Sequence, residues 1–233
     1  MSLLNQVLQE ACSCNTHSCH ILITANLTDT GTSTSGPTLA NIFFFLLNYP
    51  DAYAKAVTEI RSTFANEEEI VLGPRLSSCE YLSACIDETI RLCPVIANFL
   101  PRTVQAGGLS VGGHVFAEGT CVGASIYAVH KNEEYFAEPH LFKPERFLVD
   151  GKKVWPKGYV PYSTGPRACP GWRLASVEAS LAVARTLWRY DVRLASGKGV
   201  QALNGLEWPE RKFKSWIGLK VDGPVAQFKR REL

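Results

Sequence analysis

Apolar side chains recur at helical spacing in four stretches of this chain, and each stretch predicts an amphipathic helix. Two of these helices cover residues 21–49 and 52–64, and Asp51 would cap the second one. The third surrounds residues 81–90 and would be capped by Ser77 or Ser78. The fourth begins just beyond Cys169 and runs to Tyr190. Most of the predicted structure is therefore helical.

Short alternating segments predict a smaller β portion. Between residues 104 and 126 they are separated by glycine pairs, which is typical of successive hairpins. Strands are also expected at residues 192–194 and 215–221, followed by a solvated basic tail at residues 229–231. The pattern predicts a mainly α fold with a small β portion (α+β). We expect one domain over residues 21–233, preceded by an irregular lead-in over residues 1–20.

The first predicted helix contains an unusual polar segment. Residues 30–35 are threonine, serine and glycine, whose side chains compete for backbone hydrogen bonds, and Gly36-Pro37 follows. Because proline cannot donate to the carbonyl four residues before it, a kink is expected here. The segment is either a flawed helix with a proline bend or a helix opened beside a reaction site.

Composition excludes several classes of protein. A net charge of +2 argues against a nucleic-acid partner. The eight cysteines are scattered through apolar runs, so a reducing compartment is expected rather than a disulfide framework. The longest apolar block, residues 42–47, is far shorter than the ~18 residues of a spanning helix, so no transmembrane anchor is predicted.

A second group of cysteines and histidines lies near the start of the chain. Residues 12–20 read CSCNTHSCH, which is the composition of a metal site. The ligands are crowded into nine positions, however, whereas structural zinc sites usually draw two pairs from distant parts of the chain. We therefore expect an irregular segment without a stoichiometric metal, and a zinc module is the remote alternative.

The chemistry of the chain concentrates on the segment 162–175, YSTGPRACPGWRLA. Cys169 lies between two glycines and next to Pro170, which predicts a stiff loop of special shape. Arg167 and the start of the following helix would both favour a thiolate over a thiol. The sequence therefore predicts a presented thiolate.

Three roles are open for this thiolate from its chemistry alone. It could be a buried structural cysteine, or a nucleophile that uses a histidine base, the nearest in sequence being His130 and His140. It could also be the single protein ligand of a metal. One cysteine cannot build a zinc or iron–sulfur site, whereas haem iron takes one axial protein ligand.

The loop resembles the haem-binding signature of the cytochrome P-450 family, the haem-thiolate monooxygenases. The resemblance is carried by Tyr162, Ser163, Gly165, Arg167, Cys169 and Gly171, and tyrosine stands where the family usually has phenylalanine. It implies that Cys169 is the iron ligand of haem b, and that Tyr162, Arg167 and Gly171 belong to the haem-binding loop. It also implies the fold of the C-terminal half of a cytochrome P-450.

Three further motifs support the resemblance. Gly31 and Thr34 fall on the glycine and threonine of the family's central helix, which implies that Thr34 is a catalytic proton relay, although Ser33 replaces the usual acid. Glu88 and Arg91 match the glutamate–x–x–arginine motif. Arg146 matches the second arginine element, and together the three imply a structural lock. Arg102, like Arg167, falls where an arginine typically meets a haem propionate.

The resemblance implies insertion of one oxygen atom from dioxygen into a small organic substrate. NADPH would supply electrons indirectly, through a reductase as partner. A full-length eukaryotic relative would lie on the cytoplasmic side of the endoplasmic reticulum, whereas this chain, with no predicted anchor, would be cytoplasmic. Because only the C-terminal half is matched, we expect this chain alone to gain haem weakly and not to be a competent monooxygenase. The alternative is a non-catalytic remnant that holds no haem.

Overall fold

Helix α2 (Thr16–Asn48) is the longest element of the chain. The computed structural model describes residues 16–195, 214–215, 219–220 and 225–232, and it describes the side chains of residues 31–195 and 225–232. The helix continues through Pro37, so of the two alternatives for residues 30–37 the structure favours a flawed helix over an opened one. Thr38 Oγ1 donates to the Thr34 carbonyl (2.9 Å), a side-chain bond to the backbone one turn earlier in the helix.

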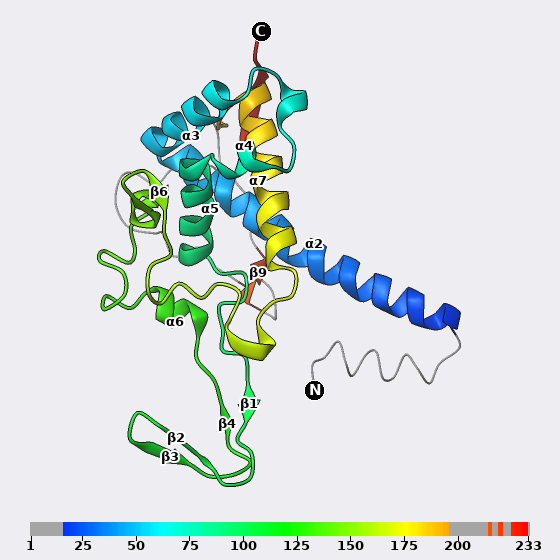
Figure 1. The fold of residues 1–233 in the computed structure, drawn as a ribbon, viewed down its shortest axis with the longest axis vertical. Helices are drawn as coiled ribbons and strands as arrows, with labels where there is room; N and C mark the ends of the chain where they lie inside the picture. The colour runs from blue at the N-terminus through cyan, green and yellow to red at the C-terminus, as the bar shows by residue number, and fades with distance from the viewer. Residues whose placement is uncertain (1–15, 196–213, 216–218, 221–224, 233) are drawn as a thin grey trace.

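The helix begins at Thr16, within the segment 1–20 expected to be irregular. Residues 1–15 lie outside the described residues. In Figure 1 the N-terminal part of α2 extends past the other helices, and its C-terminal part passes behind α7. Helix α2 is therefore the element against which the rest of the helical core packs.

Two further predicted helices are present, but their caps differ from the prediction. Helix α3 (Pro50–Thr63) follows Tyr49 and has Pro50 in its first turn, so Asp51 is inside the helix and not its cap. A 3₁₀ turn η1 (Glu67–Glu69) and a short helix α4 (Pro74–Ser77) lead into α5 (Glu80–Leu92). The caps expected at Ser77 or Ser78 are wrong as well, because Glu59 of α3 accepts from the Tyr81 and Leu82 amides (both 2.9 Å).

The middle of the chain forms the predicted hairpins. Strands β2 (Leu109–Val111) and β3 (His114–Phe116) pair antiparallel, as do β1 (Arg102–Thr103) and β4 (Cys121–Val122). They make up the arm that projects at the bottom of Figure 1. A short helix that the sequence pattern did not predict, α6 (Ile126–His130), follows and is capped by Ser125, whose hydroxyl accepts from the Ala128 amide.

The second half returns the chain to the helical core. A 3₁₀ turn η2 (Pro144–Phe147) leads to the paired strands β5 (Leu148–Val149) and β6 (Lys152–Lys153). After a further 3₁₀ turn, η3 (Gly165–Arg167), helix α7 (Trp172–Arg189) runs alongside α5 and across α2 (Figure 1). The predicted fourth helix is thus present.

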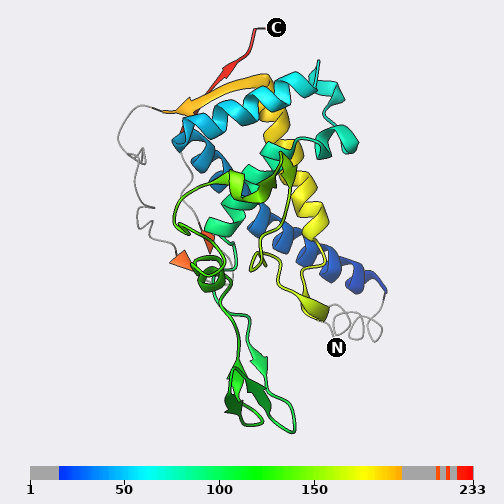
Figure 2. The same cartoon turned by 60° about the vertical axis from the view of Figure 1, so that its left-hand side comes forward.

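The C-terminal region differs from the prediction at the basic tail. Strand β7 (Tyr190–Leu194) pairs antiparallel with β10 (Ala226–Arg230), so residues 229 and 230 are paired strand residues instead of a solvated tail. Figure 2 shows this pair at the top of the molecule, beyond the C-terminal end of α7. Strands β8 (Lys214–Ser215) and β9 (Leu219–Lys220) form a small separate pair. Mostly helical structure with small sheets confirms the predicted mainly α fold with a small β portion.

The core lies where α2, α3, α5 and α7 meet. Phe45 of α2 stacks on Phe142 with their ring centroids 4.8 Å apart, and Trp188 of α7 donates to the Phe64 carbonyl at 3.0 Å. Helices α2, α5 and α7 all contact one another in this core. Across the part of the chain that the structure describes, none of the helices is long and apolar enough to cross a membrane.

Candidate functional site

Cys169 is exposed in a loop whose backbone is tightly constrained. Its amide donates to the Tyr162 carbonyl at 2.9 Å, which closes the loop over the 3₁₀ turn η3. Ser163 (φ 61°) and Gly165 (φ 73°) both adopt left-handed conformations, which cost a serine more than a glycine. Helix α7 starts three residues after Cys169, with Gly171 as its N-cap. The thiol is therefore presented at the start of a long helix, as the sequence predicted.

The surroundings of this loop are partly apolar and partly cationic. Tyr162 is half-buried with its ring 6.4 Å from that of Trp172, and burial raises the pKa of its hydroxyl. Leu174 is 63% exposed on the first turn of α7, and Arg167 is exposed at the end of η3. A Cβ added to Gly171 would meet only the Cys169 Sγ atom, at 4.0 Å. The position next to Gly171 is therefore open apart from this contact with the sulfur.

Helix α2 contacts the N-terminal half of α7, the half that follows Cys169. Ser35 Oγ of α2 donates to Glu178 Oε2 of α7 at 3.2 Å, one residue after Thr34. Thr34 is half-buried, and its Oγ1 donates to the Gly31 carbonyl at 3.3 Å. The structure thus brings the segment around Thr34 to the half of α7 that follows Cys169.

Arg102 comes from outside the cysteine loop. It lies exposed on β1, and its Nη1 donates to the neighbouring Pro101 carbonyl at 2.8 Å. It is available to an anionic ligand, and its role as a partner of a haem propionate stays a prediction.

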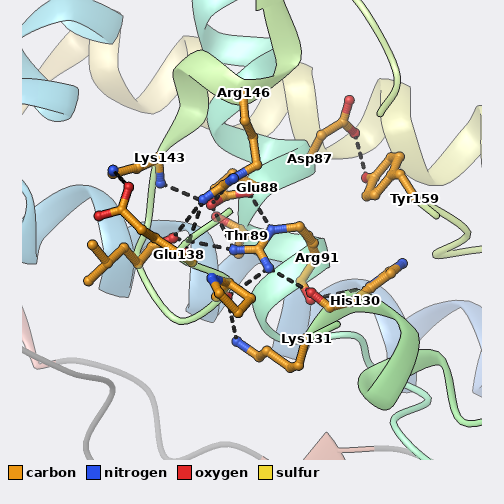
Figure 3. Close-up of polar contacts among 12 residues, drawn as sticks. Asp87, Glu88, Thr89, Arg91, His130, Lys131, Glu138, Lys143, Arg146 and Tyr159 are labelled. Carbon is orange, nitrogen blue, oxygen red and sulfur yellow. Dashed lines mark hydrogen bonds and ion pairs between the residues drawn. The ribbon is translucent and has the colours of Figure 1, made fainter. Parts of the chain in front are cut away.

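Glu88, Arg91 and Arg146 form one ion cluster, drawn in Figure 3. Glu88 accepts from Arg91 at both carboxylate oxygens (2.7 and 2.9 Å) and from Arg146 Nε at 2.9 Å. The Lys143 amide also donates to Glu88, at 2.9 Å. The side chains of Glu88 and Arg91 are 0% exposed, so this is a buried charge cluster rather than the solvated pair typical of an i,i+3 spacing.

Arg91 uses all five of its N–H donors. Besides the two bonds to Glu88, it donates to three backbone carbonyls, those of His130 (2.8 Å), Pro139 (2.8 Å) and Leu141 (3.3 Å). Arg146 adds bonds to the Ala137 and Glu138 carbonyls. The cluster therefore fixes the path of the chain from α6 to η2 against helix α5.

His130 is a buried residue, whereas the sequence suggested it only as a distant base for Cys169. It is 0% exposed, and its ring stacks on Tyr159 with the centroids 5.5 Å apart. The Tyr159 hydroxyl donates to Asp87 Oδ1 (2.9 Å), and Asp87 is paired with Lys153 (2.7 Å). No sequence signal distinguishes this histidine, because its partners come from three separate segments, around residues 91, 136 and 159.

The environment of His130 favours the neutral ring. Burial, with a further contribution from the Arg91 guanidinium and from Lys131, lowers the pKa of His130 to about 4. Lys131 itself has its pKa lowered to about 8 by burial and by Arg91. The other side chains against the ring, Tyr159 and Phe136, are uncharged aromatic groups. His130 is therefore a neutral hydrogen-bonding group at neutral pH.

A first prediction concerns acid stability. An unfolded histidine titrates near 6.5, so between pH ~6.5 and ~4 the unfolded chain binds a proton that the folded chain does not. The free energy of unfolding therefore rises with pH in this window, and about 3 kcal/mol is lost as pH falls from 6.5 to 4. Urea unfolding at half-unit pH intervals measures the loss.

The control for this prediction is His130→Gln, which cannot titrate. Carboxylates that also titrate below pH 6.5, such as Glu59 with its pKa raised by burial, are unchanged in the variant and cancel in the difference. The variant should be less stable at pH 7 but show a flatter slope between pH 6.5 and 4. Parallel pH profiles for the two proteins would contradict the assignment.

The donor set at Cys169 suits one particular kind of ligand. Among the residues with described side chains, no group of three or more histidines, cysteines or carboxylates could hold a metal ion, so the loop offers a single sulfur. The side chains of residues 12–20, where a zinc site was weighed, lie outside the described residues. One sulfur, an exposed leucine, an exposed arginine and the open space beside Gly171 fit a flat apolar group with an iron centre and anionic substituents.

This mainly helical protein presents one cysteine on a stiff loop at the start of a long helix and holds a buried Glu–Arg–Arg cluster, which is the architecture of the family that its sequence motifs resemble. Comparison with known families agrees. The sequence model of the family "Cytochrome P450" matches residues 20–214, so the chain belongs to the cytochrome P450 family.

Curated relatives are fungal enzymes. The chain is 40% identical over 210 residues to a cytochrome P450 monooxygenase of Gibberella zeae, covering 87% of this chain and 49% of the relative. It is 40% identical over 206 residues to the cytochrome P450 monooxygenase poxM of Penicillium oxalicum, covering 88% of this chain and 39% of the relative. The chain thus spans about half the length, or less, of these two relatives.

Proposed function

We propose that this chain provides the thiolate side of a haem site in a cytochrome P450 monooxygenase. The observation that carries the proposal is the exposed Cys169 in its constrained loop at the start of α7, beside an open space. Cys169 would ligate the iron of haem b through its sulfur. Tyr162 and Gly171 would line the loop, and Arg167 and Arg102 would pair with the carboxylates of the group.

Haem, when bound, supplies the iron centre at which dioxygen is activated for insertion of one oxygen atom into a substrate. The chain's own residues hold the ligand and handle protons. Thr34 would hold a proton at Oγ1, which now donates to the Gly31 carbonyl, one residue before the Ser35 side chain that contacts α7. Glu88, Arg91 and Arg146 hold the scaffold behind the loop and take no part in the chemistry.

The substrate and partners follow from family membership. We propose a small organic substrate and an NADPH-dependent reductase as the electron donor. The cytoplasmic side of the endoplasmic reticulum is the proposed location. These proposals concern the monooxygenase as a whole, of which this chain matches about half.

The test is a haem titration of the purified 233-residue chain, followed by the absorption spectrum of its reduced, carbon-monoxide-bound form. Because the described residues around Cys169 leave the sulfur, Arg102 and Arg167 exposed, we expect weak binding of one haem per chain with a thiolate-type spectrum. We also expect no substrate oxidation by this chain alone with reductase and NADPH.

Two results would overturn the proposal in different ways. A stoichiometric complex without thiolate-type absorbance would show that haem binds through another residue. No haem uptake at any concentration would favour the alternative, a member of the family that does not hold haem. Tight binding with efficient oxygenation would contradict only the expectation of weak binding.

A further inference from the structure

His130 joins two parts of the chain through both nitrogens of its ring. Its Nδ1 lies 3.2 Å from the Arg91 carbonyl at the end of α5, and its Nε2 accepts from the Val160 amide at 3.0 Å. Val160 lies two residues before Tyr162, at the entrance to the cysteine loop. The ring therefore spans from the helix that carries the buried ion cluster to the segment that leads into Cys169.

The backbone partners determine which nitrogen carries the proton. An amide can only donate, so Nε2 must be unprotonated, and a carbonyl can only accept, so Nδ1 must carry the hydrogen. A second proton on Nε2 would place two N–H groups against each other at Val160. The neutral tautomer with hydrogen on Nδ1 is thus the one that makes both bonds, in agreement with the lowered pKa described above.

Contacts on each side extend this connection. On the α5 side the link is reciprocal, because Arg91 Nη1 donates to the carbonyl of His130 at 2.8 Å (Figure 3). On the loop side the Val160 carbonyl accepts from the Ser163 amide (3.1 Å), and the Tyr162 carbonyl accepts from the Cys169 amide (2.9 Å). Two short backbone bonds therefore separate the His130 ring from the residue that holds the sulfur.

The bond at Val160 also bears on strain in the loop. Ser163 adopts φ 61°, a left-handed conformation that persists only when its neighbours hold it. The turn that closes on Ser163 begins at Val160, which has its amide on His130 and its carbonyl on Ser163. Loss of the His130 acceptor would free the start of that turn.

We propose that His130 is the positioning residue that transmits the rigidity of the Glu88–Arg91–Arg146 cluster to the Cys169 loop. It does so as a neutral ring that accepts from Val160 and donates to the Arg91 carbonyl. The importance of this positioning for haem rests on the proposed function of Cys169 as the iron ligand. The link between His130 and the loop itself is a property of the haem-free chain.

The test uses two isosteric variants that each keep one of the two bonds. In His130→Gln the side-chain oxygen can take the place of Nε2 and accept from Val160. In His130→Asn the side-chain nitrogen can take the place of Nδ1 and donate to Arg91, but nothing reaches Val160. The measurement is amide hydrogen exchange of the haem-free chain at Val160, Ser163 and Cys169, with the amides of α3 as internal reference.

We expect exchange at these three amides to be roughly fivefold to tenfold faster in His130→Asn, relative to α3, and close to wild type in His130→Gln. A general loss of stability would accelerate α3 as well and is removed by that reference. Equal exchange rates in the two variants would overturn the proposal. It would also be overturned if His130→Asn accelerated exchange at Val160 but left the exchange rate at Cys169 unchanged.

A second readout separates this proposal from the proposed function. In the haem-loaded chain, His130→Asn should shift the reduced, carbon-monoxide-bound spectrum from the thiolate type toward the non-thiolate type, and His130→Gln should restore it. If the exchange pattern is as expected but the wild-type chain never shows thiolate-type absorbance, the positioning of the loop stands and the proposed function fails. If wild type shows the thiolate type and both variants retain it fully, the positioning role fails and the proposed function stands.

Discussion

Replacing Cys169 by serine should abolish the thiolate-type absorbance of the reduced, carbon-monoxide-bound chain, while replacing Cys121 by serine should leave it intact. Serine keeps the size of the side chain and the amide that donates to Tyr162, so the loop keeps its shape. What is lost is the one sulfur that this loop presents. A hydroxyl is a far weaker iron ligand at neutral pH, because it does not ionise as a thiol does.

Cys121 is the matched control because it is the other exposed cysteine among the described residues. It lies on β4, paired with Thr103, and has neither a constrained loop nor a helix start beside it. Cys79 and Cys85 are buried, and burial raises the pKa of both thiols, so they are held as unreactive thiols.

The measurement is the spectrum of each variant at equal haem loading. Loss of the thiolate-type band in Cys169→Ser alone is the expected result. The same loss in both variants would point to a folding defect, and retention in both would remove Cys169 from the site. Circular dichroism of the haem-free variants distinguishes a folding defect from the loss of the iron ligand.

The helices could be predicted because their apolar periodicity is a local property of the sequence. The caps could not. Helix α5 is capped by Glu59, which lies on α3 and reaches the Tyr81 and Leu82 amides only in the folded chain. Residues 229–231 are likewise predicted to be a solvated tail because they are all basic, yet Lys229 and Arg230 belong to strand β10. Their strand conformation depends on pairing with β7, about forty residues away along the chain.

The candidate site could be predicted where its functional residues lie close together in the sequence. The segment from Tyr162 to Gly171 carries glycines, prolines and one cysteine, which together predict a stiff loop with a presented thiol. The spacing of Glu88 and Arg91 predicts an ion pair. It does not predict that the pair is fully buried, nor that Arg91 also holds three carbonyls between residues 130 and 141.

His130 illustrates what no local pattern contains. Its two hydrogen bonds join α5 to the loop at Val160. Both partners are backbone groups, which every residue except proline carries, so the sequence does not indicate them. The uninterrupted helix through Pro37 has a similar cause. The polar segment before it left open whether the helix would continue, and packing of α2 against α5 and α7 outweighs its weak local propensity.

The largest stability effect is expected from Glu88→Gln. Glutamine matches glutamate in shape, so the change removes charge and leaves the volume of the side chain nearly unaltered. The change leaves the fully buried Arg91 guanidinium and the mostly buried Arg146 guanidinium without an anionic partner. It also replaces one carboxylate oxygen by an NH₂ group, which would face the N–H donors of the arginines and cannot accept from them. Removal of one partner from a buried ion pair costs about 3–5 kcal/mol, a large part of a typical net stability of roughly 5–15 kcal/mol.

The matched control is Glu145→Gln, the same substitution in an exposed ion pair. Glu145 pairs with Lys55 at 2.7 Å, but both side chains are more than half exposed, so solvent screens the interaction. That variant should lose no more than about 1 kcal/mol. Urea unfolding of both variants at pH 7 gives the comparison. If Glu88→Gln is no less stable than Glu145→Gln, the charge of Glu88 is not what holds Arg91 and Arg146 in place, and the carbonyl bonds of the two arginines would have to hold the cluster by themselves.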